Sequence, residues 1–173
     1  MSNKKEFDFN GTPLRLVPHE PDNGYRFFIS FDGTIGLRIA PNGVETKVAA
    51  TTTTCENSKN PTDAKRTQRY LNFRDPWRTG EQILVSHAVY LAWIGPIPED
   101  ADCLDHLNGC TTDNRWQNLE PVTFAENNRR AKYVRFMREC DFDPRIFNAA
   151  DFHHFFSMPL EEFKTFFNHY KKD

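Results

Sequence analysis

Apolar and polar positions in the first fifty residues follow one another in short runs that end at turn signals. The runs occupy residues 25–31, 35–40 and 44–48, and the turn signals between them are Asp32-Gly33 and Pro41-Asn42-Gly43. Such runs are typical of strands joined by tight turns. The pattern predicts a small β segment over residues 1–50. A polar stretch with a threonine run follows at 51–67 and predicts a loop or a linker.

The middle of the chain changes to a helical pattern. Residues 87–94 are apolar nearly all round, Ser86 precedes them, and Gly95-Pro96 ends the run. Serine is a good N-cap, and a helix that is apolar on all sides is a buried one. The pattern predicts a short buried helix over 87–94, which we interpret as scaffold.

A strand, a loop, a second strand and a helix are predicted next. Residues 102–107 have the length of a strand, Asn108-Gly109 begins a turn-rich loop, and 118–122 can return as the second strand. Thr123-Phe124-Ala125-Glu126 has the form of a capping box, which places Asn127 in the first turn of the helix.

Phenylalanine dominates the end of the chain. Phe163, Phe166, Phe167 and Tyr170 follow the i, i+3, i+4, i+7 spacing of an amphipathic helix, and Pro159 suits its first turn. A second helical segment is predicted before it, around Phe147, Phe152, Phe155 and Phe156. We expect these helices to pack on the core or on a partner.

Composition limits the class of protein. With 173 residues, 38% of them hydrophobic and 16 of them Phe, the chain can build a core. It contains no apolar run that could cross a membrane, and its N-terminus lacks an apolar signal core, so we expect a cytoplasmic protein with reduced thiols.

The candidate chemistry lies in the predicted strand–loop–strand–helix segment. Asp105 and Asn127 offer the oxygen ligands that Mg²⁺ prefers, and His106 offers an imidazole that can take a proton from water. Taken singly, each of these residues is better explained by packing or turn chemistry. Taken together, they match what phosphodiester hydrolysis requires.

The order of these motifs resembles that of the HNH endonucleases, and most closely the HNH homing endonucleases of phages and introns. The resemblance covers about residues 83–130. It rests on His87–Pro98, Asp105-His106-Leu107-Asn108-Gly109, the stretch from Asp113 to Thr123 with Asn118-Leu119, and Glu126-Asn127.

The resemblance implies a ββα-metal fold and a role for each matching residue. His106 would be the general base, and Asp105 and Asn127 would bind one Mg²⁺ or Mn²⁺ ion. Asn118, the middle residue of the motif, would tie the loop to the second strand so that the histidine keeps one orientation. His87 would be structural. The products would carry 5′-phosphate and 3′-hydroxyl ends.

Two stretches are candidates for holding DNA, although the formal net charge of the chain is −2. Residues 127–138 contain no acid, and their cations are Arg129, Arg130, Lys132, Arg135 and Arg138. They predict phosphate contacts beside the active loop, and the alternative is an ordinary solvated face. Residues 65–78 mix basic and aromatic side chains, including Arg69 and Arg74. This second stretch is either a DNA-contacting surface or an exposed strand with its aromatic side in the core.

The four cysteines argue against structural zinc. Cys55, Cys103, Cys110 and Cys140 form no Cys-x-x-Cys pair. Cys103 and Cys110 flank the His106 loop, so a ligand pair or a disulfide between them stays open.

These expectations define an α+β protein with a small β segment at 1–50, a loop or linker at 51–67, an HNH nuclease core with a basic helix at 68–139 and a helical segment at 140–173. Its partner would be double-stranded DNA, with no membrane. One site per chain would nick one strand, and a homodimer would be needed to cut both. The alternatives are a non-catalytic DNA-binding protein on the same scaffold and a protein-interaction module that uses the Phe-rich end.

Overall fold

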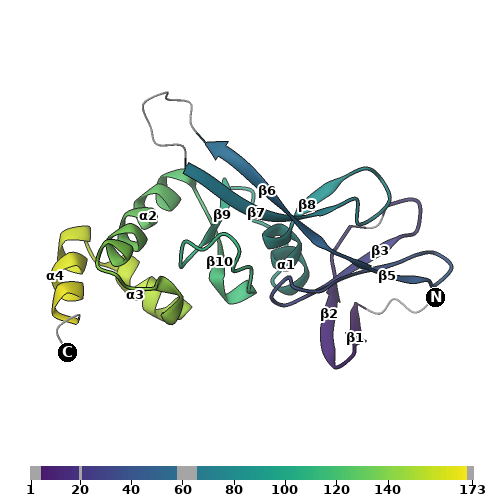
Figure 1. The fold of residues 1–173 in the computed structure, drawn as a ribbon, viewed down its shortest axis with the longest axis horizontal. Helices are drawn as coiled ribbons and strands as arrows, with labels where there is room; N and C mark the ends of the chain where they lie inside the picture. The colour runs from purple at the N-terminus through teal and green to yellow at the C-terminus, as the bar shows by residue number, and fades with distance from the viewer. Residues whose placement is uncertain (1–4, 20, 58–65, 171–173) are drawn as a thin grey trace. The chain divides into compact units, whose positions relative to one another are not determined.

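The computed structural model describes residues 5–19, 21–57 and 66–170. The chain forms two compact units (Figure 1). The first unit contains residues 1–97 and 111–116, and the second contains 98–110 and 117–173. The N-terminal part is rich in strands and the C-terminal part is helical, so the predicted α+β class is confirmed.

A five-stranded antiparallel sheet begins the first unit. Its strands follow the chain order, as β1 (Glu6–Phe9), β2 (Thr12–Leu16), β3 (Arg26–Ser30), β4 (Gly36–Ile39) and β5 (Glu45–Val48). The predicted strands and both turns of the β segment are confirmed. Gly33 and Gly43 have φ angles of 74° and 84°, which glycine adopts without the strain a Cβ would cause.

Both faces of this sheet are covered at β3. On one face, Leu14, Phe28, Leu37 and Ile39 form an apolar cluster. On the other, the ring of Phe27 meets that of Phe73 at 5.0 Å. A side chain at Gly36 would collide with these two rings, so the strand needs a glycine there.

A second sheet corrects the predicted loop or linker at 51–67. Strand β6 (Ala50–Asn57) pairs antiparallel with β7 (Arg66–Arg74), which in turn pairs with β8 (Gln82–Leu84). The threonine run therefore forms a strand, in agreement with the high β-propensity of β-branched residues. Residues 58–65 lie outside the described part of the chain.

Strand β7 has its aromatic side in the core. Phe73 and, beyond the strand, Trp77 are buried, whereas Arg74 is exposed. For residues 71–78 this agrees with the second of the two interpretations, and it leaves Arg74 available to a ligand; the side chains of residues 65–70 lie outside the described part of the chain.

Helix α1 (Val85–Trp93) starts two residues earlier than expected. Its N-cap is Leu84, which makes no side-chain cap, and Ser86 lies buried inside the helix. The predicted Ser86 cap is therefore wrong, because β8 runs directly into the helix and leaves no room for a capping turn. The burial of the helix is confirmed by Val85, Ala88, Val89 and Tyr90.

The second unit begins with a two-stranded hairpin. Strand β9 (Cys103–His106) pairs with β10 (Leu119–Val122), which follows the short 3-10 helix η1 (Trp116–Asn118). Helix α2 (Phe124–Glu139) comes next, and its N-cap Thr123 accepts a hydrogen bond from the Glu126 backbone N–H. The predicted order of elements is confirmed to within two residues.

Two further helices complete this unit. The 3-10 helix η2 (Pro144–Ile146) leads into α3 (Ala149–Ser157), and α4 (Leu160–Tyr170) follows. The buried side chains of α3 and α4 pack on Tyr133, Val134 and Met137 of α2. These side chains are Phe152, Phe155, Phe156, Phe163 and Phe167. The prediction that these helices pack on the core is confirmed. None of the helices in the described residues is long and apolar enough to span a membrane.

Candidate active site

The hairpin and its loop are held together by two asparagines. The Asn118 side chain donates from Nδ2 to Asn108 Oδ1 at 3.1 Å and accepts at Oδ1 from the Asn108 backbone N–H at 3.1 Å. The Leu107 N–H donates to the Asn118 carbonyl at 3.0 Å. Asn118 thus ties the loop after β9 to the start of β10, which limits the movement of the residues at the end of β9.

Asp105 is a buried carboxylate with a free oxygen. Its residue is 8% exposed, and Oδ2 accepts no hydrogen bond from the described residues. The Arg130 Nη1 atom lies 3.6 Å from Oδ2, which is too long for a hydrogen bond, so we treat it as a contact between charges. Burial raises the pKa of Asp105 to about 6, since the nearby positive charge of Arg130 offsets only part of this effect and Glu120 adds to it.

His106 is the last residue of β9 and is 7% exposed. In the hairpin register it faces Leu119, and Asp105 faces Glu120. Asp105 and His106 are therefore consecutive residues at the end of a strand, next to the loop that Asn118 ties down.

Asn127 lies in the first turn of α2, close to Cys103. Its Nδ2 donates to the Cys103 Sγ at 3.3 Å, and Oδ1 accepts no hydrogen bond from the residues that the structure describes. The pKa of the Cys103 thiol is raised, mainly by burial, and the charges of Asp105 and Asp102 add to this effect. Cys103 therefore lies beside both predicted metal ligands.

Sequence reasoning considered Cys103 only as a partner of Cys110. Both are free thiols, as is Cys140. The alternative of a disulfide between Cys103 and Cys110 is therefore wrong. Cys103 precedes Asp105 by two residues in β9, and side chains two apart on a strand share a face. That alternation was the signal that could have placed Cys103 beside the site.

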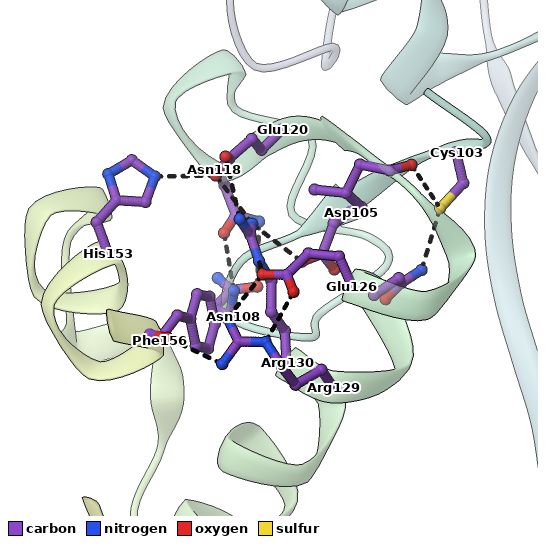
Figure 2. A network of polar contacts seen from close by, with 12 residues as sticks. Cys103, Asp105, Asn108, Asn118, Glu120, Glu126, Arg129, Arg130, His153 and Phe156 are labelled. Carbon is purple, nitrogen blue, oxygen red and sulfur yellow. Dashed lines mark hydrogen bonds and ion pairs between the residues drawn. The ribbon is translucent and has the colours of Figure 1, made fainter. Parts of the chain in front are cut away.

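A network of charged side chains surrounds Asp105 (Figure 2). Arg130 donates from Nη1 and Nη2 to the two carboxylate oxygens of Glu120 at 2.9 and 3.1 Å. Its Nε donates to Glu126 Oε1 at 2.7 Å. Both carboxylate oxygens of Glu126 also accept hydrogen bonds from Arg129. The pKa of Glu126 falls to about 2, mainly because of these hydrogen bonds.

Helix α3 closes the other side of this network. The Phe156 ring lies 5.0 Å from the guanidinium carbon of Arg130, and His153 Nε2 lies 2.9 Å from Glu120 Oε2. Sequence reasoning missed Glu120, His153 and Phe156. Glu120 could have been found from the hairpin register, which pairs it with Asp105, whereas nothing local points to the two residues of α3.

The cations predicted to hold DNA divide into two groups. Arg129, Arg130 and Arg138 are bound within the unit, Arg129 to the Phe156 carbonyl at 2.9 Å and Arg138 to the Gly109 carbonyl at 2.8 Å. Lys132 and Arg135 are exposed, and neither forms an ion pair or a hydrogen bond with the described residues. Arg74 is exposed as well, and the Arg69 side chain lies outside the described part of the chain.

The residues present fit a single hard metal ion. No group of three or more His, Cys, Asp or Glu side chains that could hold a metal occurs within the described residues. Mg²⁺ needs no such group, because it is commonly held by one or two side-chain oxygens and completes its shell with water and phosphate oxygens. The free oxygens of Asp105 and Asn127 are donors of the required kind.

Comparison with known proteins identifies the central segment. Residues 84–129 match the family model described as HNH endonuclease. No curated protein and no solved structure matches the chain. The segment from the end of β8 to the first turns of α2 is therefore similar to the HNH endonucleases, as its motifs indicated.

Proposed function

We propose that this protein is a DNA endonuclease that hydrolyses phosphodiester bonds at a single divalent metal ion, Mg²⁺ or Mn²⁺. The observation that supports it best is the free oxygen of Asp105. An acceptor atom buried without a hydrogen bond costs free energy, and a bound cation would offset that cost at a carboxylate oxygen. Asp105 and Asn127 would hold the ion.

The reaction is assigned to this chain's own residues as follows. His106 takes a proton from a water molecule as the water oxygen attacks the phosphorus atom. The bond from phosphorus to the 3′ oxygen breaks, and the leaving 3′ oxygen takes up a proton from solvent. The products carry a 5′-phosphate and a 3′-hydroxyl. Asn118 holds the loop so that His106 keeps its orientation. The metal, when bound, supplies positive charge to the phosphate oxygens and to the leaving oxygen.

Binding of the DNA backbone is assigned to the exposed cations of α2. Lys132 and Arg135 carry free positive charges on the helix that begins beside Asn127. They neutralise phosphates without breaking any internal ion pair, whereas Arg130 would have to leave two carboxylates. The resemblance in motif spacing supports an enzyme of the homing or phage type. With one site per chain, it would cut one strand unless two chains act together.

Incubation of supercoiled plasmid with the purified protein tests the proposal. Open-circular DNA should form with Mg²⁺ or Mn²⁺ and should not form with EDTA. His106→Ala, purified in the same way, shows whether a contaminating nuclease is responsible. A parent protein that binds the plasmid but never cuts it would be a non-catalytic DNA-binding protein, and one that does neither would overturn the proposal. Linear product without prior nicking would indicate a dimer.

A further inference from the structure

The side chain of Arg130 is fully engaged inside the second unit. The residue is 9% exposed, and its guanidinium gives two hydrogen bonds to Glu120 and one to Glu126. A planar guanidinium that grips a carboxylate with two parallel bonds has one fixed orientation. Arg130 therefore cannot reach a phosphate without breaking its hydrogen bonds to Glu120 and Glu126.

The same guanidinium contacts Asp105 without using one of its oxygens. Nη1 lies 3.6 Å from Asp105 Oδ2 but donates to Glu120 at 2.9 Å. A hydrogen bond would compete with a metal ion for the lone pair, whereas a charge at 3.6 Å attracts the carboxylate and leaves the lone pair free. Asp105 and Glu120 are also direct cross-strand partners, so the cation between them prevents two like charges from pushing the hairpin apart.

Two residues of helix α3 contribute to the surroundings of Arg130. The Phe156 ring lies 5.0 Å from its guanidinium carbon, and His153 binds the same Glu120 oxygen that Arg130 binds. The C-terminal end of α3 is also fixed to α2, because the Tyr133 hydroxyl donates to the carbonyl of Met158, the C-cap of α3, at 2.6 Å. Figure 2 shows Arg130 together with Glu120, Glu126 and Phe156.

From this arrangement we infer that Arg130 is a positioning residue for the metal-binding carboxylate of Asp105, and that helix α3 is part of the same apparatus through Phe156 and His153. The inference rests on the proposed function, since it assigns the orientation of a ligand that function requires. It also takes Arg130 out of the set of DNA contacts. The residues around a metal ligand commonly decide how well the ligand binds.

The test measures binding of Mn²⁺ alone to the full chain without DNA, by calorimetry, together with the salt dependence of DNA binding in EDTA. Arg130→Gln should weaken Mn²⁺ binding about 10- to 100-fold, the usual effect of losing a partner of a metal ligand. The slope of log affinity against log salt should not change. Cleavage should lose kcat with KM for DNA unchanged, and Arg130→Lys should recover part of the loss.

Arg135→Gln is the matched contrast, because it removes the same charge from the exposed side of the same helix. It should lower the salt slope by about 0.9 and leave Mn²⁺ binding unchanged. Phe156→Leu covers the case in which Arg130→Gln does not fold. It removes the ring that packs on the guanidinium and should weaken Mn²⁺ binding by up to about 30-fold, the factor that corresponds to a desolvated cation–π contact.

Three results would overturn the inference. Unchanged or tighter Mn²⁺ binding by Arg130→Gln would mean that Arg130 is only a competing positive charge. A salt slope lowered by about 0.9 in that variant would make Arg130 a phosphate contact after all. If the parent protein binds no Mn²⁺, the metal site does not exist and the inference fails with it. If the parent binds Mn²⁺ and cleaves DNA, the proposed function stands whatever the result for Arg130.

Discussion

Replacing Asp105 with Asn should stabilise the metal-free protein and at the same time abolish its function. The carboxylate is buried, one of its oxygens accepts no hydrogen bond, and its pKa is raised to about 6. A raised pKa means that the folded protein holds the proton of this group more tightly than the unfolded chain does. The ionised form is therefore a cost to folding, and the neutral amide avoids that cost.

The size of the effect follows from the two pKa values. The ordinary value is 3.8 and the folded value about 6, and each pKa unit corresponds to about 1.4 kcal/mol, so the full cost is about 3 kcal/mol. Between these two pKa values the folded state binds more protons than the unfolded state, so stability falls as the pH rises through this window. We expect Asp105→Asn to exceed the parent by about 1 kcal/mol near pH 4.5 and by about 3 kcal/mol near pH 7.5.

Urea denaturation in EDTA at the two pH values measures this difference. Asp100→Asn is the control, since it removes an exposed carboxylate from the same unit. Added Mn²⁺ should have the opposite effect on the difference in stability between the parent and Asp105→Asn. At 100 times its dissociation constant it should stabilise the parent by about 2.7 kcal/mol and leave Asp105→Asn unchanged.

The reasoning is refuted if Asp105→Asn is no more stable than the parent near pH 7.5. A stability difference that does not change with pH would refute it equally, because the gain would then come from packing and not from a buried charge. In either case the burial of its charge would no longer mark Asp105 as a ligand for a cation.

Three further predictions concern activity and DNA binding. His106→Ala should lower the cleavage rate about 10²- to 10⁴-fold, the usual contribution of a general base, while gel-shift affinity for DNA stays at the parent value. Asn127→Ala should raise the Mg²⁺ concentration needed for half-maximal cleavage, but less than Asp105→Ala does, because a neutral amide attracts the ion less than a carboxylate; equal effects would contradict this order. Lys132→Gln and Arg135→Gln should each reduce the salt slope of binding by about 0.9 on unrelated sequences, and unchanged slopes would make this face merely solvated.

The hairpin and α2 could be predicted because each boundary has a local signal. Gly109 takes a φ angle of 62° in the turn after β9, and Thr123 caps the helix with its side chain. Such signals act within a few residues, so they are visible in the sequence. The family resemblance then supplied the roles of the residues that these elements present.

Elements whose environment decides their structure could not be predicted in the same way. The threonines of β6 read as a polar linker, yet they pair along their length with β7. Ser86 read as a helix cap, yet Leu84 occupies that place because β8 leads straight into α1. In both cases a partner strand distant in sequence outweighs the local preference.

The basic run of α2 illustrates the limit for the site itself. Counting Arg and Lys from 127 to 138 finds five cations and no acid, but the carboxylates that bind them come from outside the run. Glu126 precedes it by one residue, and Glu120 lies on β10, so Arg129 and Arg130 are neutralised by groups that a count of the run omits. Arg138 is bound to backbone carbonyls of the hairpin loop.

The free charge left on α2 sets a measurable bound on how the protein holds DNA. Two exposed cations, Lys132 and Arg135, account for a salt slope of only about −2, since each neutralised phosphate contributes about −0.9. A chain with a net charge of −2 has no general positive field to add to this. A parent slope steeper than about −2 would therefore mean that cations other than these two contact the DNA backbone. Arg74, exposed on β7 of the first unit, would then be the next residue to replace.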